Sequence, residues 1–425
     1  MNRETVLSGL IDFLRQSPGC YHAVESVRKR LAENGFQELK ETEVWNLVSG
    51  SSYYVIRGGS SIVSFRLPKQ KPVRLRLTAS HSDSPCFKIK PGRGMVADGL
   101  TRLNVERYGG SILQTWFDRP LSIAGRVLVR ENDRIVSRLI YPDRDLLMIP
   151  SLAPHLSSGD KDVSIQNQML PILSADGKEL ALETVLQECG IAPSAVIGMD
   201  LFVICRMELT IWGANREFLS APRLDDLACV YGTLEGFLSA KAENDALLHC
   251  VFDNEEVGSE SKQGAASTFL RDVIDRICCA YDLNADARAA VLANSFLLSA
   301  DNAHAAHPGY PAASDPVNRP RMNGGVVLKH QAGQKYTTDG YSAAVVRALC
   351  ADCDVPLQEY TNHSDLRGGS TLGNISNTQV SLNAADIGLA QLAMHSAFET
   401  MGADDPERLV RLSQAFYTSS IPKLD

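Results

Sequence analysis

The hydrophobic positions of the first ninety residues predict two helices followed by strands. Apolar residues recur at helical spacing from Val6 to Leu14, and a second helix is expected from Ala23 to Asn34. Residues 53–57 and 62–67 flank two glycines and predict a β-hairpin. Residues 73–80 alternate like a strand, so the chain is expected to deliver His81 at a strand end.

The hydrophobic pattern changes between about residues 91 and 220. Short strand-like runs, such as Arg126 to Arg130 and Ile135 to Tyr141, are separated by polar turns and prolines. This texture is typical of a mostly β insert.

Strand-like and helix-like segments alternate from Asp225 to the end of the chain. Helices are expected at 227–240, 264–281, 341–351 and 389–401, and strands at 247–252, 295–300, 356–360 and 379–382. The alternation favours an α/β fold, with a mostly parallel central sheet flanked by helices on both faces. We therefore expect a discontinuous domain of residues 1–90 and 221–425, interrupted by a β-rich inserted domain of residues 91–220.

Length, charge and cysteine content narrow the functional classes. The 425 residues suggest two or three domains, and a net charge of −8 without a basic run argues against nucleic acid as a partner. No apolar run reaches the length of a membrane span, so no membrane association is expected. The ten cysteines are scattered and no signal peptide is seen, which predicts a cytoplasmic protein with reduced thiols.

Acidic and imidazole groups follow three of the expected strands. His81, the pair Glu255-Glu256 and Asp301 each come directly after a strand-like run. Reactive groups gather at the carboxyl ends of parallel strands, so these three segments are expected to be neighbours in space.

The adjacent carboxylates Glu255 and Glu256 can divide their labour. One binds a metal and the other handles protons, which makes Glu256 a ligand and Glu255 a general base. Asp83 stands two residues after His81, on the same side of an extended chain, and can orient the imidazole ring of a metal-bound His81.

Three other positions are ambiguous when each is considered alone. Asp225, with Asp226 directly after it, begins a predicted helix, where an Asp is commonly a cap. His395 lies in an expected helix rich in Ala and Leu, where a lone His is usually a core residue. His304, with His307 three residues later, can bind a metal or shape a pocket.

Taken together, these segments supply at least two imidazoles and at least three carboxylates. Mixed nitrogen and oxygen ligands suit zinc, and also cobalt or manganese. Two metals need one bridging ligand, and an Asp carboxylate can bridge. The sequence contains neither H-E-x-x-H nor G-x-S-x-G, so a single-zinc helix protease and a serine hydrolase with a nucleophile elbow are disfavoured.

At this point the chain resembles the aspartyl aminopeptidase family of dinuclear zinc metallopeptidases over nearly its whole length. The resemblance rests on motifs in the family's order: His81-Ser82-Asp83-Ser84-Pro85-Cys86, Arg223-Leu224-Asp225, Asn254-Glu255-Glu256-Val257-Gly258-Ser259, Ser299-Ala300-Asp301, Ala303-His304-Ala305, His307-Pro308 and Met394-His395-Ser396.

The resemblance implies two zinc ions and a role for each residue around them. It places His81 and Asp301 on one ion, Glu256 and His395 on the other, and Asp225 as the bridge. It makes Glu255 the general base and Asp83 the group that orients His81. The implied reaction is removal of an N-terminal Asp or Glu from a peptide with a free N-terminus.

The resemblance also implies substrate contacts and an assembly. Lys329 would face the acidic side chain of the substrate, and His304 is placed on the substrate side of the site. His155 would reach the active site of a neighbouring subunit near the scissile carbonyl, or serve as a further metal contact. The family forms a homo-oligomer through the inserted domain, with a tetrahedral dodecamer as the expected arrangement, so this domain would serve in oligomerisation or as a lid.

The chain departs from the family pattern at three positions and leaves two other hypotheses to test. Asp226 replaces a usual Asn, while Phe398 and Lys335 each replace a usual Arg.

One alternative keeps the metals and makes the protein a dinuclear zinc deacylase or carboxypeptidase-type hydrolase. The other, from a different class, is a non-catalytic assembly protein that keeps the shell of the fold.

Overall fold

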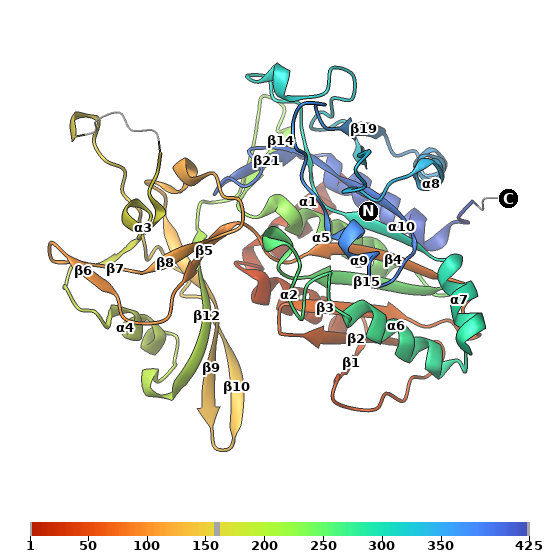
Figure 1. Ribbon diagram of the computed structural model, residues 1–425, viewed down its shortest axis with the longest axis horizontal. Coiled ribbons are helices and arrows are strands. Elements are labelled where there is room, and N and C mark those ends of the chain that lie inside the picture. The colour runs from red at the N-terminus through yellow and green to blue at the C-terminus, as the bar shows by residue number, and fades with distance from the viewer. Residues whose placement is uncertain (1, 157–161, 423–425) are drawn as a thin grey trace.

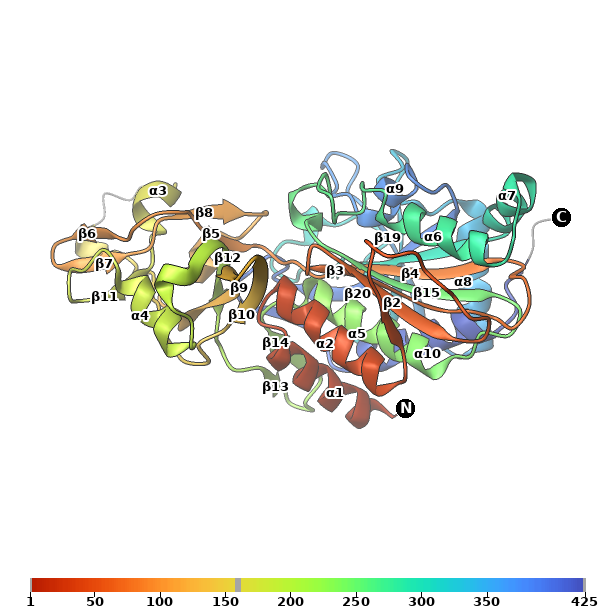
Figure 2. The same ribbon diagram turned by 90° about the horizontal axis from the view of Figure 1, so that it is seen from below.

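A large twisted sheet forms the centre of the computed structural model, which describes residues 2–156 and 162–422. Figures 1 and 2 show this sheet between two layers of helices. Its main path runs, in spatial order, through β1 (Gln37–Leu39), β2 (Ser52–Arg57), β3 (Ser61–Arg66), β15 (Ala246–Phe252), β4 (Leu75–His81), β16 (Phe296–Ala300), β20 (Asn383–Leu392), β21 (Glu399–Gly402), β14 (Phe218–Ala221) and β13 (Thr210–Trp212). Two further strands pair with β20, namely β17 (Ala303–His304) and β18 (Val326–His330), and β19 (Leu357–Thr361) pairs with β18.

The centre of the sheet is parallel and its flanks are antiparallel. Strands β15, β4, β16 and β20 pair in parallel register. On one side of this centre, β15 pairs with β3 in antiparallel register. On the other side, β20 pairs with β18 and with β21, also in antiparallel register. The expected α/β class is confirmed, and the sheet as a whole is mixed.

Helices cover both faces of the sheet and close two hydrophobic cores. One face carries α1 (Arg3–Gln16), α2 (Cys20–Glu33), α5 (Leu224–Ser239), α8 (Gly340–Asp352) and α10 (Asp405–Thr418). The other carries α6 (Phe269–Ala280), α7 (Ala285–Ala293) and α9 (Leu372–Ser376). Alternate residues of β15 enter opposite cores: Leu247 and Val251 face the first, while Leu248 and Cys250 face the second.

A second group of strands has its own hydrophobic core, which includes Phe87, Val127 and Leu201. Figure 1 shows these strands in a lobe beside the main sheet. Five antiparallel strands run in the order β10 (Arg134–Ile140), β9 (Leu121–Glu131), β12 (Val196–Cys205), β5 (Cys86–Ile89) and β8 (Val105–Tyr108). A smaller sheet holds β11 (Ile172–Ser174), β7 (Leu100–Arg102) and β6 (Met95–Ala97), beside the helices α3 (Ile165–Gln168) and α4 (Ala181–Glu188).

Five short 3₁₀ turns complete the described elements. They are η1 (Leu113–Trp116), η2 (Pro154–Leu156), η3 (Pro193–Ala195), η4 (Glu255–Val257) and η5 (Pro311–Ala313). Two of them, η1 and η4, lie next to the candidate site described below.

Two expectations for the C-terminal part are wrong. The helix expected at 389–401 is instead the end of β20, a loop of residues 393–398 and the start of β21. The strand expected at 379–382 is a turn after α9, and the strand begins at Asn383. A short apolar run fits a buried strand as well as a helix, and pairing of β20 with β16 and β18 decides for the strand.

Among the described residues, no helix is both long enough and apolar enough to cross a membrane.

Candidate metal centre

Three polar segments lie at the carboxyl ends of neighbouring parallel strands. His81 is the last residue of β4, η4 with Glu255 and Glu256 follows β15, and Asp301 follows β16. The parallel register of these strands brings their ends to one edge of the sheet. The structure therefore brings together the three segments that the sequence pattern singled out.

Two clusters of potential metal donors share one aspartate. In the first, His81 Nε2 lies 3.4 Å from Asp225 Oδ1 and 3.9 Å from Asp301 Oδ1. In the second, His395 Nε2 lies 3.6 Å from Asp225 Oδ2 and 3.4 Å from Glu256 Oε2. Within each cluster the donor atoms lie within 4.8 Å of one another, so each can hold a cation.

A bound metal explains the arrangement of these donors better than hydrogen bonds among them do. Asp225 is 3% exposed, and its Oδ1 has no hydrogen-bond partner among the described residues. A buried carboxylate oxygen without a donor is costly unless a cation compensates it. Imidazole nitrogens combined with carboxylate oxygens are a donor set that zinc accepts.

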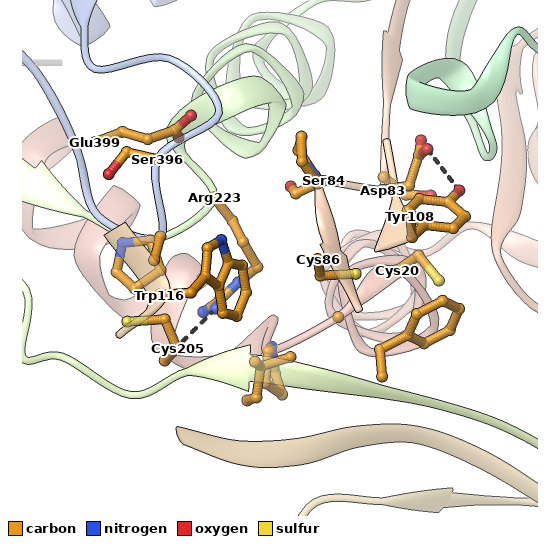
Figure 3. A pocket seen from close by; sticks show the side chains of 18 residues that line it. Cys20, Asp83, Ser84, Cys86, Tyr108, Trp116, Cys205, Arg223, Ser396 and Glu399 are labelled. Atoms are coloured by element: carbon orange, nitrogen blue, oxygen red, sulfur yellow. Dashed lines mark hydrogen bonds between the residues drawn. The ribbon is translucent and has the colours of Figure 1, made fainter. Parts of the chain in front are cut away.

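Asp83 supports both sides of the cluster. Its Oδ1 accepts the backbone N–H of Glu255 at 3.1 Å, and its Oδ2 accepts the N–H of Glu256 at 3.2 Å. Tyr108 of β8 donates its hydroxyl to the same carboxylate at 2.8 Å, as Figure 3 shows. The backbone oxygen of Asp83 lies 3.1 Å from His81 Nδ1, which leaves Nε2 directed at the carboxylates. Asp83 thus fixes η4 and the imidazole ring together.

Glu399 is a buried group that the sequence pattern did not mark as functional. Its Oε2 accepts the backbone N–H of Asp225 at 3.0 Å, and its Oε1 accepts the N–H of His395 at 2.8 Å. The carboxylate of Glu399 therefore holds together the backbone segments that carry Asp225 and His395, two donors of the second cluster. His395 has a φ of 67°, and the bond to Glu399 helps to hold its backbone in this left-handed conformation.

The sequence marked Asp226 as part of a pair at a helix start and as a departure from the family pattern. Its carboxylate is buried within the first cluster, and Oδ2 accepts the backbone N–H of His81 at 3.2 Å. Burial raises the pKa of Asp226 well above the usual range, and the nearby Asp301 and Asp225 add to this rise. Its position beside Asp225 is the one sequence signal that could have pointed to it.

Burial and neighbouring charges shift the pKa values of the carboxyl groups in the site in both directions. Burial, followed by the charges of Asp301, Asp83 and Asp225, raises the pKa of Glu255 to about 8 against the opposing effect of His81. Burial also raises the pKa of Asp301, but Lys329 and His81 outweigh it and lower this pKa to about 2. The cluster accordingly attracts positive charge.

A cavity with a volume of about 120 Å³ opens on the cluster. Lys329 and His304 line it together with Tyr336 and Tyr360. Lys329 is 2% exposed, and its ammonium donates to the backbone oxygens of Asp301 at 2.7 Å and Asn302 at 3.2 Å. Although burial lowers the pKa of Lys329, Asp301 and the further groups Tyr336 and Asp386 together outweigh that effect and raise it.

The two histidines expected on the substrate side lie in different places. His304 is exposed and lines the cavity from β17. His155 is exposed in η2, and it is not among the described residues that line the cavity. Within one chain the structure thus gathers all the expected site residues except His155.

The match to a family model and the match to a related protein point to the same family. Residues 13–417 match the model of the aminopeptidase I zinc metalloprotease (M18) family. A probable M18 family aminopeptidase 2 of Clostridium novyi (strain NT) is 38% identical, over 98% of this chain and 99% of the relative.

Solved structures agree in fold. The cryo-EM structure of the Ape4 and Nbr1 complex includes a chain 32% identical, with a TM-score of 0.94, covering 98% of this chain and 86% of that one. The structure of the S. cerevesiae mApe1 dodecamer is 26% identical, with a TM-score of 0.86, covering 99% and 98%. The metal-donor cluster and these likenesses lead to one conclusion: the chain belongs to the M18 family of zinc aminopeptidases.

Proposed function

We propose that this protein removes the N-terminal residue from peptides, with a preference for Asp or Glu, and that it uses two zinc ions to do so. The observation that carries this proposal is the position of Asp225 in both donor clusters, each of which has its own histidine. Cobalt or manganese would be substitutes, since the donor set also suits them.

Each donor residue has a place in this proposal. His81 and Asp301 would hold one ion, Glu256 and His395 the other, and Asp225 would bridge them. Asp83 would orient His81 and keep Glu255 and Glu256 in place through their backbone N–H groups. When bound, the ions supply Lewis acidity, which polarises a peptide carbonyl and lowers the pKa of a water molecule.

Glu255 is proposed as the general base. It lines the cavity, and its carboxylate also lies within a third group of potential donors, with His81 and Glu256. Its carboxylate would take a proton from the attacking water and pass it to the leaving amine, as a base with a pKa near neutrality does well.

Lys329 is proposed to select acidic residues. Within the described part of the chain, it is the one Lys or Arg that lines the cavity. Its ammonium is buried, stays charged beside Asp301, and would attract the side-chain carboxylate of a substrate Asp or Glu. His304, exposed at the cavity, would contact the same substrate.

The assembly and the domain division are also proposals. We propose a catalytic domain of residues 1–90 and 221–425 and an inserted domain of 91–220. The separate hydrophobic core supports an inserted unit, but its strands begin at β5 and end at β12, whereas β13 and β14 pair within the main sheet. The inserted domain would mediate a homo-oligomer, with a tetrahedral dodecamer as the expected form, and the solved mApe1 dodecamer supports this. The exposed His155 would then serve a neighbouring subunit. A cytoplasmic location is proposed because the ten cysteines are unpaired.

A substrate panel with metal analysis tests the proposal. Purified protein would be assayed with dipeptides that begin with Asp, Glu, Ala or Leu, each with a free or an acetylated amine. The proposal expects fastest hydrolysis for free Asp and Glu, no hydrolysis of acetylated substrates and about two zinc ions per chain. Equal turnover of acetylated substrates would favour a deacylase instead.

A further inference from the structure

The chain at the end of β8 connects the second group of strands to the metal-donor cluster. This stretch comprises residues 108–115, and we call it the 108–115 segment. Tyr108 packs edge-on against Phe202 of β12, with ring centroids 5.5 Å apart. Its hydroxyl donates to Asp83 at 2.8 Å and accepts the side-chain N–H of Asn254 at 2.8 Å. Tyr108 therefore joins the second group of strands to the two segments that follow β4 and β15.

Two glycines of the 108–115 segment lie so close to metal-donor residues that a side chain has no room. A β-carbon on Gly109 would lie 3.1 Å from the β-carbon of Glu256, and the φ of 74° at Gly109 also favours glycine. A β-carbon on Gly110 would lie 3.1 Å from Nδ1 of His395. The backbone of the segment thus touches both residues that, with Asp225, form the second donor cluster.

The carbonyl of Gly110 determines which nitrogen of His395 is free to bind a metal. Its oxygen lies 3.3 Å from Nδ1 of His395. A carbonyl oxygen only accepts, so Nδ1 carries the hydrogen of this bond and Nε2 of the neutral ring keeps its lone pair. Nε2 is the atom that faces the carboxylates of the second cluster. The ring of His81 is held in the same way, but by the backbone oxygen of Asp83 in its own segment.

Two further hydrogen bonds tie the loop that carries His395 to the 108–115 segment. The backbone N–H of Ile112 donates to the backbone oxygen of His395 at 2.9 Å. The hydroxyl of Thr115, in η1, accepts the N–H of Ala397 at 3.0 Å and donates to the backbone oxygen of Ile112 at 2.7 Å. Glu399 holds His395 through its backbone N–H, and the 108–115 segment holds it through its carbonyl and its side chain.

We propose that the 108–115 segment is a positioning element for the second metal ion, and that the Gly110 carbonyl fixes the tautomer and direction of the His395 ring. The second group of strands then serves the metal centre of its own chain, besides any part in assembly. The inference rests on the proposed function for the identity of the ion, whereas the placement of the His395 ring can be tested on metal-free protein. Loss of a group that hydrogen-bonds to a metal ligand typically lowers metal affinity by about 10–100-fold.

Gly110→Ala tests the placement of the ring without metal or catalysis. Gly110 is not among the described glycines with a positive φ, so the added methyl group conflicts chiefly with the His395 ring. The matched control is Gly198→Ala, in β12 of the same group of strands, where a β-carbon would lie 3.4 Å from Leu128, an ordinary contact.

Crystal structures of the metal-free wild type and both variants would be compared. In the wild type and in Gly198→Ala, Nδ1 of His395 should lie within hydrogen-bond distance of the backbone oxygen of residue 110. In Gly110→Ala the ring should turn or move away from that oxygen. A ring in the same place in all three proteins would overturn the proposal, whatever the enzyme's substrate proves to be.

Zinc titration against a competing chelator tests the effect on the second ion. The wild type and Gly198→Ala should bind two ions per chain. Gly110→Ala should keep the ion at His81 and Asp301, while its affinity for the other ion falls by about 10–100-fold, and excess zinc should restore peptidase activity. Equal zinc affinities in Gly110→Ala and Gly198→Ala would contradict the positioning role. A wild type that binds a single ion would contradict the two-metal proposal instead, and the ring position would then decide the present inference.

Thr115→Val is a milder test, in case Gly110→Ala folds poorly. Valine has nearly the same shape as threonine but leaves the N–H of Ala397 without its acceptor. The affinity for the second ion should fall by about fivefold, as expected for one lost hydrogen bond, and Thr115→Ser should restore it because serine keeps the hydroxyl. Equal zinc binding by Thr115→Val and Thr115→Ser would show that this bond does not position His395, and would count against the proposal.

Discussion

Replacing Glu399 by Gln tests how one buried carboxylate supports the donor cluster. In the wild type each oxygen accepts one backbone N–H, from Asp225 at 3.0 Å and from His395 at 2.8 Å. The Gln side chain has nearly the same shape but only one acceptor oxygen, and its amide group would face one of the two N–H donors. One bond is lost and the donor is left without an acceptor.

The size of the effect follows from the kind of bond that is lost. Hydrogen bonds to a charged group contribute about 1.5–3 kcal/mol, and a buried donor without a partner adds to the loss. Burial and the charge of Asp225 raise the pKa of Glu399 to about 8, and cations at Asp225 would favour its ionised form. Loss of a group that hydrogen-bonds to a metal ligand typically lowers metal affinity by about 10–100-fold. We expect Glu399→Gln to lower the affinity for zinc by a factor of this size.

Zinc affinity would be measured by competition with a chelator, and kcat/KM would be measured at saturating zinc. The matched control is Glu235→Gln, a buried glutamate of α5 that pairs with Arg30 away from the site. Both variants should lose thermal stability, but only Glu399→Gln should lose zinc affinity. If the two variants bind zinc equally well, Glu399 has a structural role alone.

Three further substitutions separate the roles within the site. Glu255→Gln should keep its zinc and lose about 10²–10⁴-fold in kcat, because proton transfer is removed; full activity with bound zinc would contradict its role as base. Lys329→Met should lower the preference for Asp over Ala, measured as the ratio of kcat/KM values, by about 10–100-fold, and an unchanged ratio in the zinc-loaded variant would reject that role. Asp226→Asn should stabilise the metal-free protein more at pH 8 than at pH 5. Because the pKa of Asp226 is raised in the folded state, the folded protein keeps a proton that the unfolded chain loses above about pH 4. The free energy of unfolding of the wild type therefore falls as pH rises. Melting temperatures would show a gain of about 1–3 °C at pH 8, and an equal gain at both values would contradict this reasoning.

The parallel centre of the fold and half of the donor cluster were predictable from the sequence. His81, Glu255, Glu256 and Asp301 follow apolar runs, and polar residues after buried strands tend to gather at one sheet edge. Strand periodicity and strand ends are local properties, so a single sequence reveals them.

The other half of the cluster depends on contacts that local pattern does not show. His395 was expected in a helix, but it lies in a loop whose backbone is held by Glu399 and by the pairing of β20 and β21. Tyr108 reaches Asp83 from β8 in the second group of strands. These contacts depend on how distant strands pair, which neither periodicity nor capping signals reveal.

Anomalous scattering at the zinc edge, from crystals of the zinc-loaded protein, tests the central claim most directly. We expect two zinc peaks per chain, one beside His81 and Asp301 and the other beside Glu256 and His395, with Asp225 in contact with both. A single peak, or zinc bound away from Asp225, would contradict the proposed two-metal centre.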